Sequence, residues 1–321
     1  MANDQPFRHP GLEARDSLGS GRDVAQGVRE APQMAVSLLG PLRIEVCGRP
    51  VASLRYAKAR ALLAYLAAAQ GRPHRRTTLA ALLWPDRDEQ AARHDLSQAL
   101  WTLQRAIGDP ADASGRGRDP LFELSRDTVA LRAGARCWVD VAELVAALDA
   151  CERHAHRAAE RCDHCGRRRE EAAALYRGDF LSDLALPDSA PFEEWAASTR
   201  SGLRQRVLSA LLALVDWRKQ RGDDDEAIRA GRRLMELEPW HEEGHRRLVR
   251  TLAASGHRSA ALAEHERFRA ILARDLGCAP EPETSALVEA IRQGGLTPRQ
   301  AAGPTRRLRT MARLPAPSGP L

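Results

Sequence analysis

The segment 75–108 constrains the fold of this 321-residue chain more than any other part of its sequence. A threonine, Thr77 or Thr78, can cap a short helix that runs through Trp84 and stops at Pro85. A turn and a longer helix follow within the same segment. A short helix, a turn and a longer helix are typical of a helix-turn-helix motif.

The longer helix separates into an apolar face and a polar face. Asp86 or Asp88 can cap its start, and Gly108 follows its end. Four apolar residues step by four, three and four positions and share one buried stripe: Leu96, Leu100, Leu103 and Ile107. The opposite face and its flanks carry polar or aromatic side chains: Arg93, His94, Ser97, Gln98, Trp101, Thr102, Gln104 and Arg105. The pattern predicts a packed helix with one outward face, which is either a binding face or merely solvated.

The side chains of this outward face suit the major groove of DNA. Amide, guanidinium and hydroxyl groups can hydrogen-bond to base edges or phosphates. Gln98 could contact an adenine at two atoms, and Arg105 could reach a guanine or a phosphate. Trp101 either packs beneath the hairpin that follows, the arrangement we favour, or touches sugars and thymine methyl groups. With the turn before it, this face predicts a DNA-reading helix.

A hairpin after the longer helix would complete a winged helix. Leu121–Leu124 and Thr128–Leu131 are predicted strands, joined by the turn Ser125–Asp127. Arg126 lies at the tip of this turn, where it could enter the adjacent minor groove. Three residues at the start of the short helix are expected to contact phosphates: Arg75, Arg76 and Thr77.

Basic residues are concentrated in front of the helix-turn-helix. The whole chain has a formal net charge of +6 and a pI near 9.3. Between residues 43 and 76 there is one acid, Glu45, and there are eight basic residues: Arg43, Arg49, Arg55, Lys58, Arg60, Arg72, Arg75 and Arg76. This imbalance indicates an anionic partner, here double-stranded DNA, although an ordinary solvated face is the alternative.

The N-terminal part adds strands and one further helix to this motif. Val36–Leu39 and Leu42–Val46 are predicted strands, and Ala57–Gln70 is a predicted helix. Residues 1–33 are rich in glycine, proline and charge without periodicity, so we expect a disordered tail. We therefore expect a winged-helix DNA-binding domain over residues 34–134.

The chain is helical almost throughout from Asp140 onward. Predicted helices cover Val141–Leu148, Glu170–Tyr176 and Phe192–Lys219, and the last of them is expected to break near Ser201-Gly202. This part therefore predicts an all-α domain.

An internal repeat follows, with an offset of thirty-four residues. Four pairs of residues share this offset: Gly222 and Gly256, Ala227 and Ala261, Leu234 and Phe268, Leu237 and Ile271. Thirty-four residues is the tetratricopeptide period, in which each helix pair buries its apolar face on its neighbour. We expect a tetratricopeptide-like domain over residues 138–292 and a disordered basic tail over residues 293–321. The fold class is thus mainly α, a winged helix-turn-helix with short strands followed by helical repeats.

The sequence resembles the actinobacterial antibiotic-regulatory-protein (SARP) type of transcription activator. The resemblance spans roughly Met34–Arg292 and rests on these segments: LLGPLRIEVCGRPV, KARALLAYLA, LAALLWPD, ARHDLSQALWTLQRAIGD, VDVAELVAAL, ALYRGDFL, FEEW and LEPWHEEGHRRLVRTLAASGHRSAALAEHERFRAILARDLGCAPEPET. It implies an OmpR-like winged helix followed by a bacterial transcriptional activator domain. It also implies binding to direct-repeat promoter sites, often as a dimer, with recruitment of RNA polymerase.

A cluster of cysteine and histidine residues lies between the first helices of the predicted all-α domain. Its members are Cys151, His154, His156, Cys162 and Cys165. Two cysteines separated by two residues suit tetrahedral Zn²⁺, and Cys151 with one of the two histidines would complete four ligands. A zinc ion held by four protein ligands would be structural. The alternative is a polar loop whose cysteines are incidental.

No catalytic motif is found in the sequence. It contains no phosphate-binding G-x4-G-K-[ST] loop, no G-x-S-x-G elbow and no H-E-x-x-H motif. No apolar run is long enough to span a membrane, so we expect a cytoplasmic, non-enzymatic protein that needs no cofactor and has no membrane partner. Two other hypotheses stay open: a helical scaffold that binds DNA without specificity, and the front part of a larger regulator with an ATPase module elsewhere.

Overall fold

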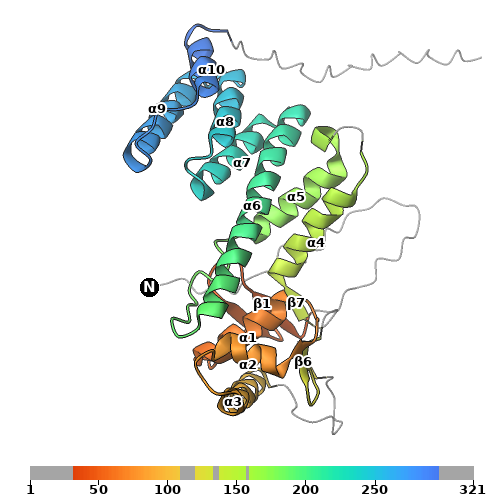
Figure 1. Ribbon diagram of the computed structural model, residues 1–321. Coiled ribbons are helices and arrows are strands. Elements are labelled where there is room, and N and C mark those ends of the chain that lie inside the picture. Colours follow the sequence, from red (N-terminus) through yellow and green to blue (C-terminus); the bar gives the residue numbers. More distant parts are fainter. Residues whose placement is uncertain (1–31, 109–119, 133–136, 157–158, 296–321) are drawn as a thin grey trace, which may run out of the picture.

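A computed structural model describes residues 32–108, 120–132, 137–156 and 159–295 (Figure 1). Within these ranges, an N-terminal unit of helices and short strands (residues 34–139) is followed by an elongated arm of helices (residues 140–292). The expected fold class is confirmed: strands are confined to the N-terminal unit, and the arm is helical. None of the helices in the described ranges combines the length and the apolarity that crossing a membrane requires.

A four-stranded sheet begins the N-terminal unit. Its order is β3 (Arg49–Pro50), β2 (Arg43–Val46), β1 (Met34–Ser37) and β7 (Cys137–Val139). β1 runs antiparallel to β2 and parallel to β7, and all four residues of β1 are buried. The strand order brings residues about a hundred positions apart in sequence together, so the start of the helical arm is fixed to the first strand.

α1 (Ala57–Ala68) comes next, and the helix-turn-helix follows as α2 (Arg76–Leu83) and α3 (Glu89–Ile107). The expected threonine caps of the short helix are wrong, because α2 begins at Arg76 and its N-cap is Arg75. The two-residue strand β4 (His74–Arg75) pairs with the hairpin, and the Arg76 amide donates to the Asp127 carbonyl at 2.8 Å. The hairpin thus supplies an acceptor for the first amide of α2, which has no side-chain cap.

α3 begins and ends as its sequence predicts. The carboxylate of Asp88, one of the two expected caps, accepts from the Ala91 amide at 2.9 Å. Gly108 ends the helix with a φ of 67°, a left-handed conformation that glycine adopts without strain.

The predicted wing is present as a hairpin. β5 (Phe122–Leu124) pairs antiparallel with β6 (Thr128–Leu131), and β4 pairs with the other side of β6. The Ser125 hydroxyl accepts from the Asp127 and Thr128 amides and so fixes the turn. The first expected strand residue, Leu121, precedes β5.

The arm consists of seven α-helices and one short 3-10 helix in the described ranges. They are α4 (Asp140–Arg153), η1 (Ala159–Arg161), α5 (Asp163–Leu175), α6 (Ala190–Arg221), α7 (Asp224–Leu237), α8 (Glu242–Ala254), α9 (Arg258–Asp275) and α10 (Pro282–Arg292). From α4 to α9, each α-helix packs against the next, and α10 packs on α8 and α9. The expected tails lie almost entirely outside the described residues.

The expected break near Ser201-Gly202 is wrong, because α6 continues through both residues. Nothing lies within 4 Å of the position a Gly202 side chain would occupy, so this glycine faces open space. Buried residues on both sides of it, such as Ala196 and Leu203, pack into the core. Their packing outweighs the cost of about 1 kcal/mol that glycine brings to a helix interior.

The thirty-four-residue repeat is confirmed by matching positions in α7 and α9. Gly222 and Gly256 each precede one of these helices with φ values of 79° and 84°. The other pairs also match in burial: Ala227 and Ala261 are fully buried, Leu234 and Phe268 are buried, and Leu237 and Ile271 are half-buried. Equivalent residues therefore serve equivalent packing positions in successive helix pairs.

Candidate nucleic-acid interface

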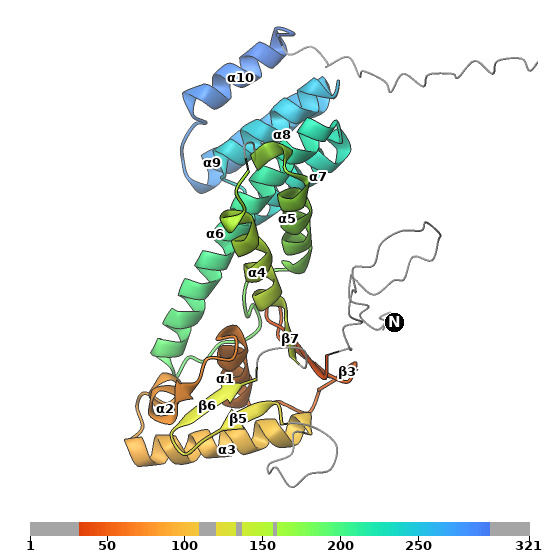
Figure 2. The ribbon, with the colours of Figure 1, turned by 90° about the vertical axis from the view of Figure 1, so that its right-hand side faces the viewer.

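α3 lies at the end of the molecule opposite α10 (Figure 1). α1 and α2 pack against one side of it, and in Figure 2 its far side faces away from every other labelled element. The four predicted stripe residues Leu96, Leu100, Leu103 and Ile107 are all buried. The helix is thus anchored by its apolar stripe and leaves one face uncovered.

The uncovered face carries most of the residues predicted to read DNA. Six of them are exposed: Arg93, His94, Ser97, Gln98, Trp101 and Arg105. Thr102 is half-buried, and Gln104 is buried, so the expectation that Gln104 flanks the outward face is wrong. Its position lies next to Leu103 and Ile107, close to the apolar stripe.

Trp101 exposes 58% of its surface, so the expectation that it packs beneath the wing is wrong. Its ring instead supports Arg105, whose guanidinium carbon lies 5.1 Å from the ring centroid. A guanidinium over an indole face is a cation–π contact. The pair forms an exposed platform with a charged edge near the C-terminal end of α3.

The hydroxyl groups of this face already donate hydrogen bonds within the helix. Ser97 Oγ donates to the Arg93 carbonyl at 2.9 Å, and Thr102 Oγ1 donates to the Gln98 carbonyl at 2.8 Å. With their protons used, both oxygens are left with acceptor capacity. A cytosine or adenine amino group suits such an acceptor, whereas a phosphate oxygen does not.

The predicted phosphate contacts differ in how they are held. Arg75, Thr77 and Arg126 are exposed, Arg126 at the wing tip. Arg76 is half-buried, and its Nε donates to the Ser125 carbonyl at 3.1 Å, so this side chain supports the wing turn. Burial and the nearby charge of Arg93 lower the pKa of Arg76. The like charges of Arg76 and Arg93 thus lie near the junction of α3 and the wing, where an anion would be attracted.

Two of the eight basic residues counted in the sequence do not contribute free charge. Lys58 is buried, donates to the Leu83 carbonyl at 2.6 Å and forms an ion pair with Asp188 at 2.8 Å. Arg60 forms an ion pair with Asp183, also at 2.8 Å. Both acids precede α6, so these charges fix the arm to the N-terminal unit. The charge argument for an anionic partner is correspondingly weaker than the sequence suggested.

Comparison with known proteins identifies the helical arm. Residues 139–292 match the family model of the bacterial transcriptional activator domain. The arm therefore resembles this domain, and we call it the activator domain for that reason. The solved structure of Mycobacterium tuberculosis EmbR in complex with a low-affinity phosphopeptide matches the chain with a TM-score of 0.56 and 26% identity. The match covers 82% of this chain but 65% of the EmbR chain, so this chain spans less than two-thirds of that relative. No curated protein matches it.

The predicted resemblance to SARP-type activators is thereby confirmed, with an activator domain behind a winged-helix unit. The way the two parts join was missed by the sequence reasoning. Asp140, the first residue of α4, accepts from the Leu38 and Leu39 amides at 2.8–2.9 Å and pairs with Arg177. Its burial raises its pKa, against the lowering effect of these partners.

A second contact fixes the activator domain to the helix-turn-helix. Ser189, the N-cap of α6, is fully buried, and its hydroxyl donates to the Leu82 carbonyl at the end of α2 at 2.6 Å. Trp195 of α6 packs against Tyr65 of α1, with ring centroids 4.8 Å apart. The sequence does not show which distant segment an aspartate, a serine or a tryptophan will contact, so none of the three marks a domain contact.

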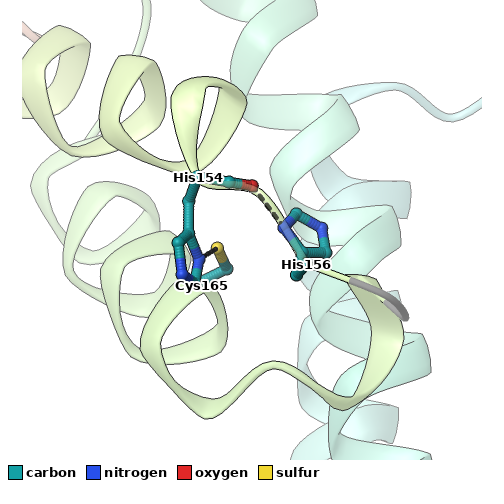
Figure 3. A group of neighbouring side chains, drawn as sticks. All are labelled: His154, His156 and Cys165. Atoms are coloured by element: carbon teal, nitrogen blue, oxygen red, sulfur yellow. Dashed lines mark hydrogen bonds between the residues drawn. The ribbon is translucent and has the colours of Figure 1, made fainter.

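The cysteine and histidine residues predicted as zinc ligands lie far from α3. Cys151 and Cys165 are buried, Cys162 and His154 are half-buried, and His156 is exposed. They gather where α4 ends and α5 begins, within the activator domain (Figure 3). This cluster is therefore a separate site from the candidate DNA interface.

Proposed function

We propose that this chain is a transcription activator that binds promoter DNA through α3 and the neighbouring wing. The observation that carries the proposal is the uncovered polar face of α3, at the end of the molecule opposite the C-terminal helices. A helix held by an apolar stripe and flanked by a hairpin is the element that winged-helix proteins insert into the major groove. The activator domain supports a role in transcription and not in catalysis.

In this proposal, Gln98 and Arg105 read bases. Both are exposed on α3 and lie two turns apart on one face. Gln98 can bond to an adenine through its amide, and Arg105 can bond to a guanine through its guanidinium. The Trp101 ring holds the Arg105 guanidinium before DNA arrives, which reduces the entropy lost on binding. The His94 ring supplies a further polar contact on the same face, and the Ser97 and Thr102 oxygens supply acceptors.

Phosphate contacts would come from residues around this face. Arg75 and Thr77 flank the start of α2, Arg93 lies in the first turns of α3, and Arg126 is at the wing tip. Arg126 is assigned to the minor groove, and Arg76 to supporting the wing. These charges would give affinity that depends on salt and only weakly on sequence.

The activator domain would bind the protein partners. We assign to it the contact with RNA polymerase and the pairing of two copies on adjacent repeats of a promoter site, as in SARP-type activators. α7–α10 lie away from α3, so DNA bound at α3 leaves their surfaces accessible (Figure 1). A response to a signal would act on the same domain.

A binding assay on the promoter nearest to its own gene tests the proposal. The full chain is titrated against that duplex and against a scrambled duplex at about 150 mM salt, where non-specific phosphate binding is weak. We expect tighter binding to the promoter, and a loss of about 1–3 kcal/mol for Gln98→Ala and for Arg105→Ala. Arg232→Ala, an exposed arginine of α7, is the matched control and should bind like the unmodified chain.

Equal affinity for the two duplexes would overturn the proposal of sequence-specific DNA binding. It would favour a helical scaffold that binds DNA without specificity. Loss of binding with Arg232→Ala but not with Arg105→Ala would move the interface from α3 to the arm. A reporter gene behind the same promoter measures activation and separates binding from contact with polymerase.

A further inference from the structure

Four potential metal ligands meet at one end of the α4–α5 hairpin. Cys151 lies in the last turn of α4, and His154 directly follows that helix. Cys162 is the N-cap of α5, and Cys165 lies in its first turn. The ligands come in two pairs, Cys-x2-His and Cys-x2-Cys, which is the spacing with which a turn presents two ligands to one zinc ion.

The distances between these side chains fit one tetrahedral ion. His154 Nδ1 lies 3.2 Å from Cys165 Sγ and 3.5 Å from Cys162 Sγ. Bonds of about 2.0 Å to nitrogen and about 2.3 Å to sulfur place neighbouring ligand atoms of a tetrahedron roughly 3.5–3.8 Å apart. The Cys151 thiol lies beside these ligands, because it donates to the Cys165 carbonyl oxygen at 3.6 Å and interacts with the Cys165 side chain.

The three thiols are close enough to affect one another. Cys165 interacts with the side chains of both Cys162 and Cys151. Cys165 is fully buried, and Cys151 nearly so. Zinc binds cysteine as thiolate, and the charge of the ion would compensate three thiolates held this close together.

We propose that Cys151, His154, Cys162 and Cys165 bind one Zn²⁺ ion as a structural Cys3His site. His154 is the histidine ligand, because its ring lies against Cys165, whereas His156 is exposed and its Nδ1 lies 2.5 Å from the His154 carbonyl (Figure 3). Four protein ligands leave no open position for substrate. On binding, zinc displaces the thiol protons to solvent, so affinity rises with pH.

The ion would fix the first helices of the activator domain. It joins the end of α4 to the start of α5, and α5 in turn packs on α6. The Trp217 indole occupies the space beside Gly166 and donates to Asp163 at 3.1 Å. Any side chain at Gly166 would overlap that ring. A zinc-fixed α5 therefore keeps the contact with α6, the helix that reaches back to the DNA-binding unit.

Metal analysis of the full chain, purified without chelator, is the first test. We expect close to one equivalent of zinc, and removal with a chelator should lower the melting temperature by roughly 5–10 °C relative to protein at a hundredfold excess of zinc over its Kd. Cobalt(II) added to the reduced, metal-free chain should give the visible absorption of a tetrahedral thiolate site. Less than one-tenth of an equivalent of zinc together with no cobalt spectrum would overturn the proposal.

Paired variants test the ligand set. His154→Ala should weaken zinc binding at least tenfold, while His156→Ala should leave it unchanged. Cys162→Ser, at a half-buried position, should shift the cobalt spectrum toward fewer thiolates, whereas Cys278→Ser, an exposed cysteine near the end of the domain, should not. If His156→Ala and not His154→Ala lost the metal, or if Cys278→Ser changed the spectrum, the assigned ligands would be wrong. Cobalt titration reports on the site even where a variant is too unstable for thermal analysis.

Discussion

Two tryptophans of the helix-turn-helix have opposite surroundings. Trp101 on α3 is 58% exposed, and Trp84 at the end of α2 is 8% exposed. Helical periodicity placed Trp101 on the outward face, but the general tendency of tryptophan to be buried suggested packing against the wing. Periodicity gave the right answer, because the Arg105 guanidinium covers part of the ring and makes exposure tolerable.

We expect Trp101→Ala to change DNA binding and Trp84→Ala to change stability. Removing the exposed ring should alter the unfolding free energy by no more than about 0.5 kcal/mol. It should weaken promoter binding by roughly 1 kcal/mol, because Arg105 loses its support. Trp84→Ala should cost about 3–5 kcal/mol in stability. Urea unfolding and duplex titration of both variants separate the effects; a large stability loss for Trp101→Ala would contradict the outward placement.

The partners of single charged residues were the hardest feature to predict from the sequence. Lys58 and Arg60 were counted with the basic residues in front of the helix-turn-helix, yet each pairs with an aspartate more than a hundred positions away. A sequence shows the charge of a residue and its near neighbours, but not the acid that folding brings to it. In contrast, the polar face of α3 depends only on helical geometry, and it could be predicted apart from Gln104.

At the scale of elements, helix ends were predicted where the capping group is local. Asp88 caps α3 through a residue three positions away, and the sequence pointed to it. α2 has no side-chain cap, because the wing carbonyl of Asp127 accepts from its first amide. Similarly, α6 passes through Gly202 because distant residues pack on both sides of it. The strands, helices and repeat could thus be predicted, and the exceptions are ends and breaks set by tertiary contacts.

Asp88→Ala should destabilise α3 at its N-terminus. The change removes the acceptor for the Ala91 amide, which typically costs about 0.5–2 kcal/mol. Asp86→Ala, two residues earlier at an exposed position, should change stability by less than about 0.5 kcal/mol. Chemical denaturation measures both values. Equal effects of the two substitutions would mean that the reading helix is not capped by Asp88.

At the scale of the whole molecule, the N-terminal unit and the activator domain share one core. Buried residues from the first strand to α7 form one continuous apolar cluster, and a second, smaller one joins α7–α10. The sequence predicted two domains but gave no sign of how they join, because the types of Asp140, Ser189 and Trp195 do not reveal the distant segments that folding brings to them. A shared core couples the arm mechanically to α3.

Ser189→Ala should weaken this coupling. Without the hydroxyl, the Leu82 carbonyl at the end of α2 loses its donor, and we expect a loss of about 1–3 kcal/mol in the unfolding free energy. Ser182→Ala, an exposed serine before α6, is the matched control. Because the core is continuous, the substitution should lower the melting temperature of both parts together. Separate transitions for the two parts in the unmodified chain would contradict a shared core.

A buried histidine pair in the C-terminal helices should make the stability of the protein depend on pH. His245 of α8 is fully buried, stacks on Phe268 at 4.0 Å between ring centroids, and lies 3.3 Å from the His265 ring nitrogen. Burial first, then the charges of His265 and Arg246, lower the pKa of His245 from 6.5 to about 3. Burial also lowers the pKa of His265. Both rings are therefore neutral in the folded protein at neutral pH.

The sign of the effect follows from where the proton binds. Between pH 6.5 and about 3, His245 binds a proton in the unfolded chain but not in the folded chain. The unfolding free energy therefore falls as the pH falls through this window. From pH of about 6.5 to 5 we expect a loss of roughly 1–2 kcal/mol from this residue. His245→Gln should flatten the pH dependence of urea unfolding, while His257→Gln, at an exposed position, should leave it unchanged. Equal slopes for the unmodified chain and His245→Gln would show that this buried histidine is not what makes the molecule sensitive to acid.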